Sequence, residues 1–91
     1  MRAVLESGML VQGARVEELE ERLASVCARR YAVACSSGTS ALELALAALG
    51  VEGGEVLCPD LSWPSPAHAI VDAGATPVIF DVDPISWNGT A

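Results

Sequence analysis

The stretch that decides the fold class is Tyr31-Ala-Val-Ala-Cys35-Ser-Ser-Gly-Thr-Ser40-Ala-Leu-Glu-Leu-Ala-Leu-Ala-Ala-Leu49-Gly50. Its apolar beginning, residues 31–35, predicts a short strand that stops at the small polar residues 36–39. Ala and Leu, which are strong helix formers, then predict a helix over residues 40–49 that Gly50 ends. Because only Glu43 interrupts the apolar surface of this helix, we expect the helix to be covered on more than one side.

The same alternation of strand and helix continues along the chain. Residues 55–58 predict a second strand ended by Pro59, residues 64–73 a helix with prolines in its first turn, and residues 76–82 a third strand. Elements that alternate at this spacing predict an α/β fold whose strands are parallel. No element is expected in the tail, residues 83–91.

An amphipathic helix is expected before this region. Between residues 15 and 30, apolar side chains recur at spacings of three and four: Val16, Leu19, Leu23, Val26 and Cys27. Acidic residues crowd the first turns and Arg29 and Arg30 close the helix, an order that the helix dipole favours. We interpret its charged residues, which include Glu17, Glu18, Glu20 and Glu21, as a solvated face. Residues 1–14 show little periodicity and are interpreted as an irregular arm.

Composition excludes several classes of function. The chain has 91 residues and a net charge of −7, and all five of its full cations are arginines. No basic stripe could follow a phosphate backbone, so nucleic-acid binding is not expected. Without lysine, the chain supplies no Walker-type lysine, no lysine nucleophile and no internal Schiff base. An apolar fraction of 52% is too high for intrinsic disorder.

The cysteines and the apolar runs indicate the cellular environment. Cys27, Cys35 and Cys58 form no C-x-x-C pair, so neither a disulfide framework nor a metal site is expected, and a reducing cytoplasm fits best. We interpret Cys35 and Cys58 as buried small apolar groups. Residues 1–13 lack the core of a signal peptide, and no run approaches the roughly 20 apolar residues of a membrane span. A cytoplasmic protein without a membrane contact is expected.

The first candidate ligand site is Cys35-Ser-Ser-Gly-Thr-Ser40. Ligands of open α/β sheets bind beyond the carboxyl ends of the strands, at helix N-termini. Here Gly38 would let the backbone approach a ligand, the Ser and Thr residues offer hydroxyls, and first-turn N–H groups point outward. This combination is typical of an anion site, above all for phosphate. The alternative is simple helix capping, because Ser40 and Glu43 have the spacing of a capping box.

The second candidate is Pro59-Asp-Leu-Ser-Trp63-Pro, between the second strand and its helix. Trp63 is expected at the same edge of the sheet, where its indole can stack on a ring held nearby. The alternative is that Trp63 only fills a loop. His68 is interpreted as a structural histidine, and Asp81 either reaches the same edge or caps the turn that follows it.

Together these motifs resemble the beginning of a DegT/StrS-type sugar aminotransferase, a family that depends on pyridoxal 5′-phosphate (PLP) and has the aspartate-aminotransferase fold, fold type I. The resemblance spans essentially the whole chain and departs from the family pattern at Ala14, Pro66 and His68. The motifs that carry it are Ser7-Gly8-Met-Leu-Val-Gln-Gly13, Val16-Glu-Glu-Leu-Glu20, Ser37-Gly-Thr-Ser-Ala-Leu42, Pro59-Asp-Leu-Ser-Trp63-Pro, Ala69-Ile70, Gly74-Ala-Thr-Pro77 and Phe80-Asp-Val-Asp83.

The resemblance implies a fold. Residues 1–14 would form an N-terminal arm, and residues 15–91 an incomplete N-terminal part of the PLP-binding large domain. That part would hold three mainly parallel strands of an incomplete sheet, in which residues 31–35 do not neighbour residues 55–58.

The resemblance also implies site roles. Gly38, Thr39 and Ser40 would hold the PLP phosphate through backbone N–H groups and the Thr hydroxyl, and Trp63 would stack on the pyridine ring. The family's Schiff-base lysine and pyridine-pairing aspartate fall beyond this chain, so no catalytic residue is assigned within it, and no metal is implied.

The expected function is therefore that of an N-terminal fragment of an aminotransferase, inactive alone. Its parent enzyme would move an amino group from an amino acid such as glutamate to a keto sugar nucleotide, for polysaccharide or secondary-metabolite synthesis. The parent would be a cytoplasmic homodimer. Two alternatives come from other classes: a small non-catalytic module that binds a phosphorylated ligand, and a structural subunit for a partner chain that carries the missing lysine.

Overall fold

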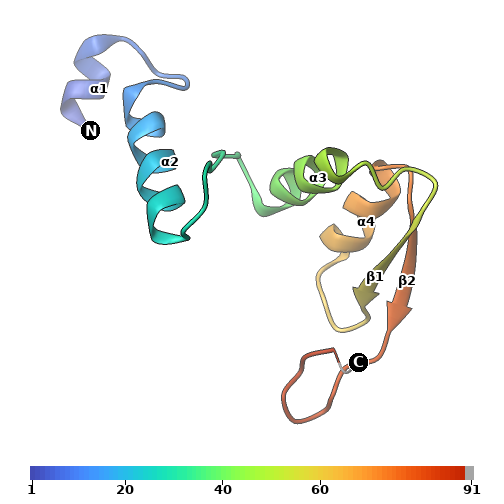
Figure 1. Cartoon of the computed structure of the whole chain (residues 1–91). Coiled ribbons are helices and arrows are strands. Elements are labelled where there is room, and N and C mark those ends of the chain that lie inside the picture. The colour runs from blue at the N-terminus through green and yellow to red at the C-terminus, as the bar shows by residue number, and fades with distance from the viewer. Residues whose placement is uncertain (90–91) are drawn as a thin grey trace. The chain divides into compact units, whose positions relative to one another are not determined.

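The computed structural model describes residues 1–89 and divides the chain into two compact units, residues 1–34 and 35–91. The first unit contains helices α1 (Arg2–Ser7) and α2 (Ala14–Val26). The second contains helix α3 (Gly38–Leu49), strand β1 (Glu55–Pro59), helix α4 (Pro64–Asp72) and strand β2 (Thr76–Phe80), all labelled in Figure 1. The prediction of an α/β fold is confirmed by this mixture of helices and parallel strands.

Helix α1 lies where an irregular arm was expected. Arg2 and Glu6 form an ion pair of 2.9 Å four residues apart, a spacing that stabilises a helical turn. Gly8 ends the helix with a φ of 69°, the left-handed conformation that glycine adopts without a steric cost. The prediction for this segment missed a helix that only local contacts support.

Helix α2 ends four residues before the predicted end. Ala28 adopts a left-handed φ of 51°, and the N–H groups of Ala28 and Arg29 donate to the carbonyls of Ser25 and Ala24. This pair of bonds is the Schellman pattern, with alanine where glycine is usual. Arg29 and Arg30 therefore follow the helix and do not close it. The expected apolar stripe is only partly covered: Leu19, Leu23 and Val26 are exposed, and Ala24 is the buried residue.

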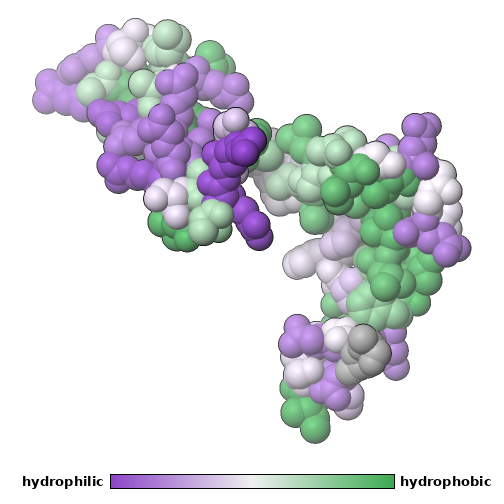
Figure 2. Space-filling view, in the orientation of Figure 1, coloured by the Kyte–Doolittle hydropathy of each residue, from purple (hydrophilic) through white to green (hydrophobic). Residues whose placement is uncertain are grey.

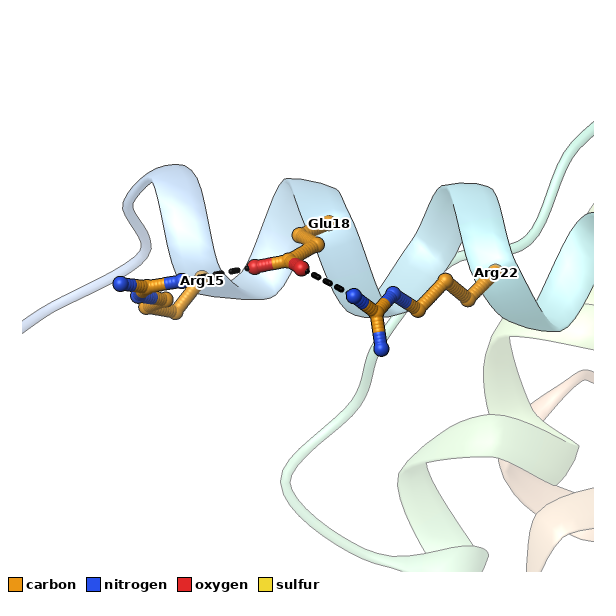
Figure 3. Close-up of polar contacts among 3 residues, drawn as sticks. All are labelled: Arg15, Glu18 and Arg22. Atoms are coloured by element: carbon orange, nitrogen blue, oxygen red, sulfur yellow. Dashed lines mark hydrogen bonds and ion pairs between the residues drawn. The ribbon is translucent and has the colours of Figure 1, made fainter.

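Charged residues along α2 are held by local pairs. Glu18 bridges Arg15, three residues earlier, and Arg22, four residues later, at 2.9 and 2.5 Å (Figure 3). These three side chains are substantially exposed, and so are Glu17 and Glu21, as a solvated face predicts; Glu20 is the exception, because it is half-buried. Such exposed pairs stabilise a helix by only about 0.3–0.5 kcal/mol each.

Residues 31–35 do not form the predicted strand. The described sheet has two strands, β1 and β2, and the side chains of Tyr31 and Val33 are largely exposed. Strand structure requires a hydrogen-bonded neighbour, and apolar character alone does not provide one. The count of three strands was therefore wrong for residues 1–89, and the expected place of this segment in the sheet is not tested.

The second unit is built on a βαβ motif. Strands β1 and β2 pair in parallel from Glu55↔Thr76 to Pro59↔Phe80, and α4 connects them and contacts both. Helix α3 packs on α4. The core of this unit consists of Cys58, Ile70 and Ala75, with Leu46, Val51, Val56 and Ala67 packed against it.

Apolar surface remains uncovered on this unit. Leu44, Leu49 and Leu57 are 55%, 75% and 70% exposed, so one side of α3 and one side of the sheet lack a covering layer among the described residues. Figure 2 shows this apolar surface over α3 and the strands, and hydrophilic surface over α2. Within residues 1–89, α4 is the helix or strand that contacts α3 most, so the predicted cover on more than one side is not seen there.

Strand β2 stops two residues earlier than predicted, at Phe80. Just after it, the Asp81 carboxylate accepts a hydrogen bond of 2.8 Å from the N–H of Val82, a bond within the chain rather than to a neighbouring strand. Residues 83–89 contain no helix or strand, as predicted, and an isolated bridge pairs Val82 with Gly89. The last two residues of the tail, for which no element was predicted, lie outside the described residues.

Candidate functional site

Ser37 is the N-cap residue of α3. Its backbone is extended, and its Oγ accepts a hydrogen bond of 3.1 Å from the N–H of Ser40, the contact that N-cap serines typically make. The alternative in which Ser40 and Glu43 form a capping box is therefore wrong: the cap residue, Ser37, lies three residues earlier. The helix begins at Gly38, so Gly38, Thr39 and Ser40 form its first turn.

Two backbone donors of this turn remain without a helical acceptor. The first N–H groups of any helix lack intrahelical partners. Ser37 satisfies Ser40 with its hydroxyl and Ala41 with its carbonyl, at 3.1 Å each. The N–H groups of Gly38 and Thr39 are the ones left, and the helix dipole makes this end attractive to a negative charge.

Space for an anion exists beside Gly38. A Cβ atom built on Gly38 would meet nothing within 4 Å, and the backbone of Gly38 is not in the left-handed region. The protein's own packing therefore does not require glycine at this position. A ligand that approaches the backbone closely would require it.

Hydroxyl groups line the same turn. Ser40 Oγ lies 3.1 Å from Ser37 Oγ and 3.4 Å from Ser36 Oγ, and Thr39 and Ser40 are half-buried. The cluster offers hydroxyl donors beside the two backbone N–H groups. This donor set has the chemistry that a phosphate group needs.

Trp63 lies at the second predicted place, the loop after β1. It is the N-cap residue of α4, with φ −64° and ψ 158°, and 84% of its surface is exposed. The following proline explains the extended backbone, because Pro64 disfavours the helical conformation for the residue before it. The alternative in which Trp63 fills a loop is not supported, since a side chain this exposed packs little.

The two places belong to helices that pack on each other. The C-terminal ends of α3 and α4 meet beside the beginning of β1 (Figure 1). A groove there is lined by Leu46, Gly50, Val51, Asp72 and Gly74. Helix α4 runs antiparallel to the strands, so its first turn and Trp63 lie toward their carboxyl ends. The sequence placed both candidates at one edge of a sheet that includes residues 31–35, and these residues are not in this sheet. A single pocket formed by the first turn of α3 and Trp63 therefore stays a prediction.

Three other residues singled out by the sequence have clear surroundings. His68 is exposed on α4, so its interpretation as a structural histidine is wrong. Asp81 accepts a bond only from the adjacent N–H of Val82, and the turn that follows is capped by Asp83, so Asp81 does not cap that turn. Cys58 is 2% exposed, as expected, whereas Cys35 is exposed, contrary to expectation, because no sheet covers its segment.

Two acidic residues have roles that sequence reasoning missed. Asp83 Oδ1 accepts hydrogen bonds from the N–H groups of Ile85 and Ser86 at 3.0 and 2.7 Å. The bonds from Ser86, and then that from Ile85, hold the pKa of the Asp83 carboxyl below its ordinary value. Glu20 Oε1 accepts a bond of 2.7 Å from the N–H of Ala34. The Asp83-Pro84 pair could have signalled the first turn; no local pattern signals the second contact.

A comparison with protein families identifies the chain. Residues 1–91 match the DegT/DnrJ/EryC1/StrS aminotransferase family. The chain belongs to this family. The predicted resemblance is thereby confirmed over the whole sequence, and the α/β architecture described above fits a part of the aminotransferase fold.

Family membership assigns the general chemistry. The DegT/DnrJ/EryC1/StrS aminotransferases are transferases and depend on PLP as a family. Residues 1–89 contain no group of three or more His, Cys, Asp or Glu side chains that could hold a metal ion. Within the same residues, no helix has the length and apolar character needed to cross a membrane.

Proposed function

We propose that the first turn of α3 holds the phosphate of PLP and that Trp63 stacks on the pyridine ring. The observation that carries the proposal is the donor set at Gly38 and Thr39: two N–H groups without a helical acceptor, next to open space. Thr39 and Ser40 add hydroxyl donors, and the exposed indole of Trp63 is free to face a ring. Family membership supports PLP as the phosphate carrier.

The residues of this chain would bind and orient the cofactor. PLP, when bound, acts as an electron sink that lets an amino group move between an amino acid and a carbonyl compound. The first turn of α3 would fix the phosphate end of the cofactor, and Trp63 would fix the plane of its ring. The chain has no lysine, so a lysine amine that bonds covalently to the cofactor would come from outside residues 1–91.

The finer assignment follows the family resemblance. Residues 1–14 would act as an arm and residues 15–91 as part of a PLP-binding large domain, in a cytoplasmic enzyme that acts as a homodimer. The substrates would be an amino acid such as glutamate and a keto sugar nucleotide. Exposed apolar side chains on α3 and on the sheet support a further layer or subunit that covers them.

Fluorescence titration tests the proposed site. PLP added to the chain should quench tryptophan fluorescence, because the pyridine ring would lie on Trp63. Quenching should persist in Trp87→Phe and disappear in Trp63→Phe; Trp87, which is also exposed, makes its own bond to the carbonyl of Pro84 and serves as the control. Quenching that Trp63→Phe leaves unchanged would contradict the stacking role.

A turnover assay tests the expected inactivity. The chain mixed with PLP, glutamate and a keto sugar nucleotide should form no amino sugar above a control without protein, since it contains no lysine. Binding of PLP without turnover fits the proposal. Turnover by the chain alone would show that catalysis here does not need a lysine.

A further inference from the structure

The loop between β1 and α4, residues 60–63, carries Trp63 and is held at its start by the end of β2. The N–H of Asp60 donates a hydrogen bond of 3.0 Å to the carbonyl of Phe80. This bond continues the parallel ladder one step past its last pair, Pro59↔Phe80. Among the hydrogen bonds of the described residues, it is the one that joins this loop to a strand.

A tight turn connects Asp60 to Trp63. The carbonyl of Asp60 accepts a hydrogen bond of 3.1 Å from the N–H of Ser62, two residues later, which is the pattern of a γ-turn. Leu61, at the centre of this turn, does not have a positive φ, so the turn is of the common inverse type. Trp63 follows directly as the N-cap residue of α4, and α4 contacts both strands. The backbone of Trp63 is therefore fixed on both sides.

Phe80, which accepts the bond from Asp60, is itself held in place. Its backbone pairs with β1 at the end of the ladder, and its side chain is half-buried. The backbone of Gly89 lies against its ring, because a Cβ atom added to Gly89 would clash with that ring. Gly89 is also paired with Val82 in the isolated bridge of the tail. Both the sheet and the tail therefore contact the residue whose carbonyl anchors the loop.

We propose that Phe80 is a positioning residue for Trp63: its carbonyl, through the N–H of Asp60, fixes the turn that sets the direction of the indole. This inference rests on the proposed stacking of Trp63 on PLP. All of these contacts lie within one unit, residues 35–91. Because the indole is 84% exposed and packs little, the backbone of the loop is what limits where it can lie.

Backbone relaxation of the 91-residue chain tests the fixed turn. The order parameters of Ser62 and Trp63 should be about 0.85, the value of rigid backbone, and values below about 0.6 would overturn the inference. Asp60→Pro removes the N–H and suits the extended Pro59 before it, so this variant should lower both order parameters. Unchanged order parameters in Asp60→Pro would also overturn the inference.

Two control variants separate the loss of the bond from other effects on the loop. Leu61→Pro adds a proline to the same loop at a φ that an inverse γ-turn shares with proline, and the N–H that it removes makes no hydrogen bond within residues 1–89. Asp60→Ala changes the side chain and keeps the N–H. Both controls should leave the order parameters of Ser62 and Trp63 unchanged, and an equal fall in all three variants would overturn the role of the Phe80 carbonyl.

Affinity for PLP tests the consequence for the site. In a Trp87→Phe background Trp63 is the one remaining tryptophan, and its quenching reports the binding of PLP. Asp60→Pro should weaken binding about fivefold, which corresponds to one backbone hydrogen bond of about 1 kcal/mol, and the two controls should bind as the unaltered chain does. If the unaltered chain binds PLP and Asp60→Pro binds it equally well, positioning is refuted while the proposed function stands. If the unaltered chain binds no PLP, the proposed function fails and the positioning role fails with it, although the order parameters would still report the fixed turn.

Discussion

Among the described residues, residues 1–34 bury Ala24 alone, whereas residues 35–89 bury Cys58, Ala69, Ile70 and Ala75 around a parallel strand–helix–strand motif. The first region is held by local contacts: exposed ion pairs, the helix ends at Gly8 and Ala28, and the bond from Ala34 to Glu20. The second is held by side chains far apart in sequence. The difference predicts that the two regions respond to substitutions in different ways.

Both regions also leave apolar surface exposed. Leu19 and Leu23 on α2, and Leu44 and Leu57 in the second unit, are between 45% and 70% exposed. Contiguous exposed apolar surface of this kind typically marks an interface. Its presence on helices and sheet alike fits a chain whose family fold has further layers to cover it.

The largest expected effect is at the core of the second region. Ile70 is 3% exposed and packs with Cys58 and Ala75, so Ile70→Ala should lower the free energy of unfolding by about 3 kcal/mol. Val71→Ala, one residue on and 57% exposed, should change it by less than about 0.5 kcal/mol. Urea unfolding followed by circular dichroism measures both. Equal losses for the two variants would contradict the assigned core.

A smaller effect of opposite sign is expected in the first region. Ala28 has a left-handed φ of 51°, a conformation that disfavours residues with a Cβ by roughly 1–2 kcal/mol. Ala28→Gly should therefore stabilise the end of α2 by about 1 kcal/mol, measured as slower amide exchange near Ala24. Ala47→Gly, within α3, should instead destabilise its helix by about 1 kcal/mol. A destabilising Ala28→Gly would refute the left-handed helix end.

The smallest expected effect is at the ion pairs of α2. Glu18→Gln removes the charge that pairs with Arg15 and Arg22. At low salt this should lower the stability of helix α2 by less than about 0.5 kcal/mol per pair, seen as a small loss of helical signal. The difference should vanish at high salt, because exposed charges are screened. Circular dichroism at two salt concentrations measures it, with Glu21→Gln as the control. A salt-independent loss would show that Glu18 acts through packing.

What the sequence predicted well was the part that buries side chains. Apolar runs separated by Gly50, Pro59 and Gly74 predicted the bounds of α3, β1, α4 and β2 to within about two residues. Buried faces produce periodic apolar patterns in the sequence, and helix and strand ends are marked by glycine and proline. The strand predicted at residues 31–35 failed because pairing depends on a partner that a local pattern does not contain. Helix α1 and the early end of α2 were missed because one ion pair and one left-handed alanine decide them.

The candidate site was predicted in its residue types but not in its details. Small residues before an apolar helix indicated an anion-binding turn, and the structure shows the two unpaired donors at Gly38 and Thr39 that such a turn needs. The alternative of a cap at Ser40 named the wrong serine, because several serines lie close together in sequence and Ser37 is the one that caps the helix. The Glu20 contact spans fourteen residues, and nothing in its neighbourhood marks it as different from the other glutamates of α2.

Backbone amide shifts during a titration with PLP test the central claim most directly. If the first turn of α3 holds the phosphate, the amide signals of Gly38 and Thr39 should move strongly with PLP and hardly at all with pyridoxal, which lacks the phosphate. Gly38→Ala should keep the fold, since its new Cβ meets open space, and should lose the response. The claim would be contradicted if the amide signals of Gly38 and Thr39 did not shift with PLP, or if they shifted equally with pyridoxal.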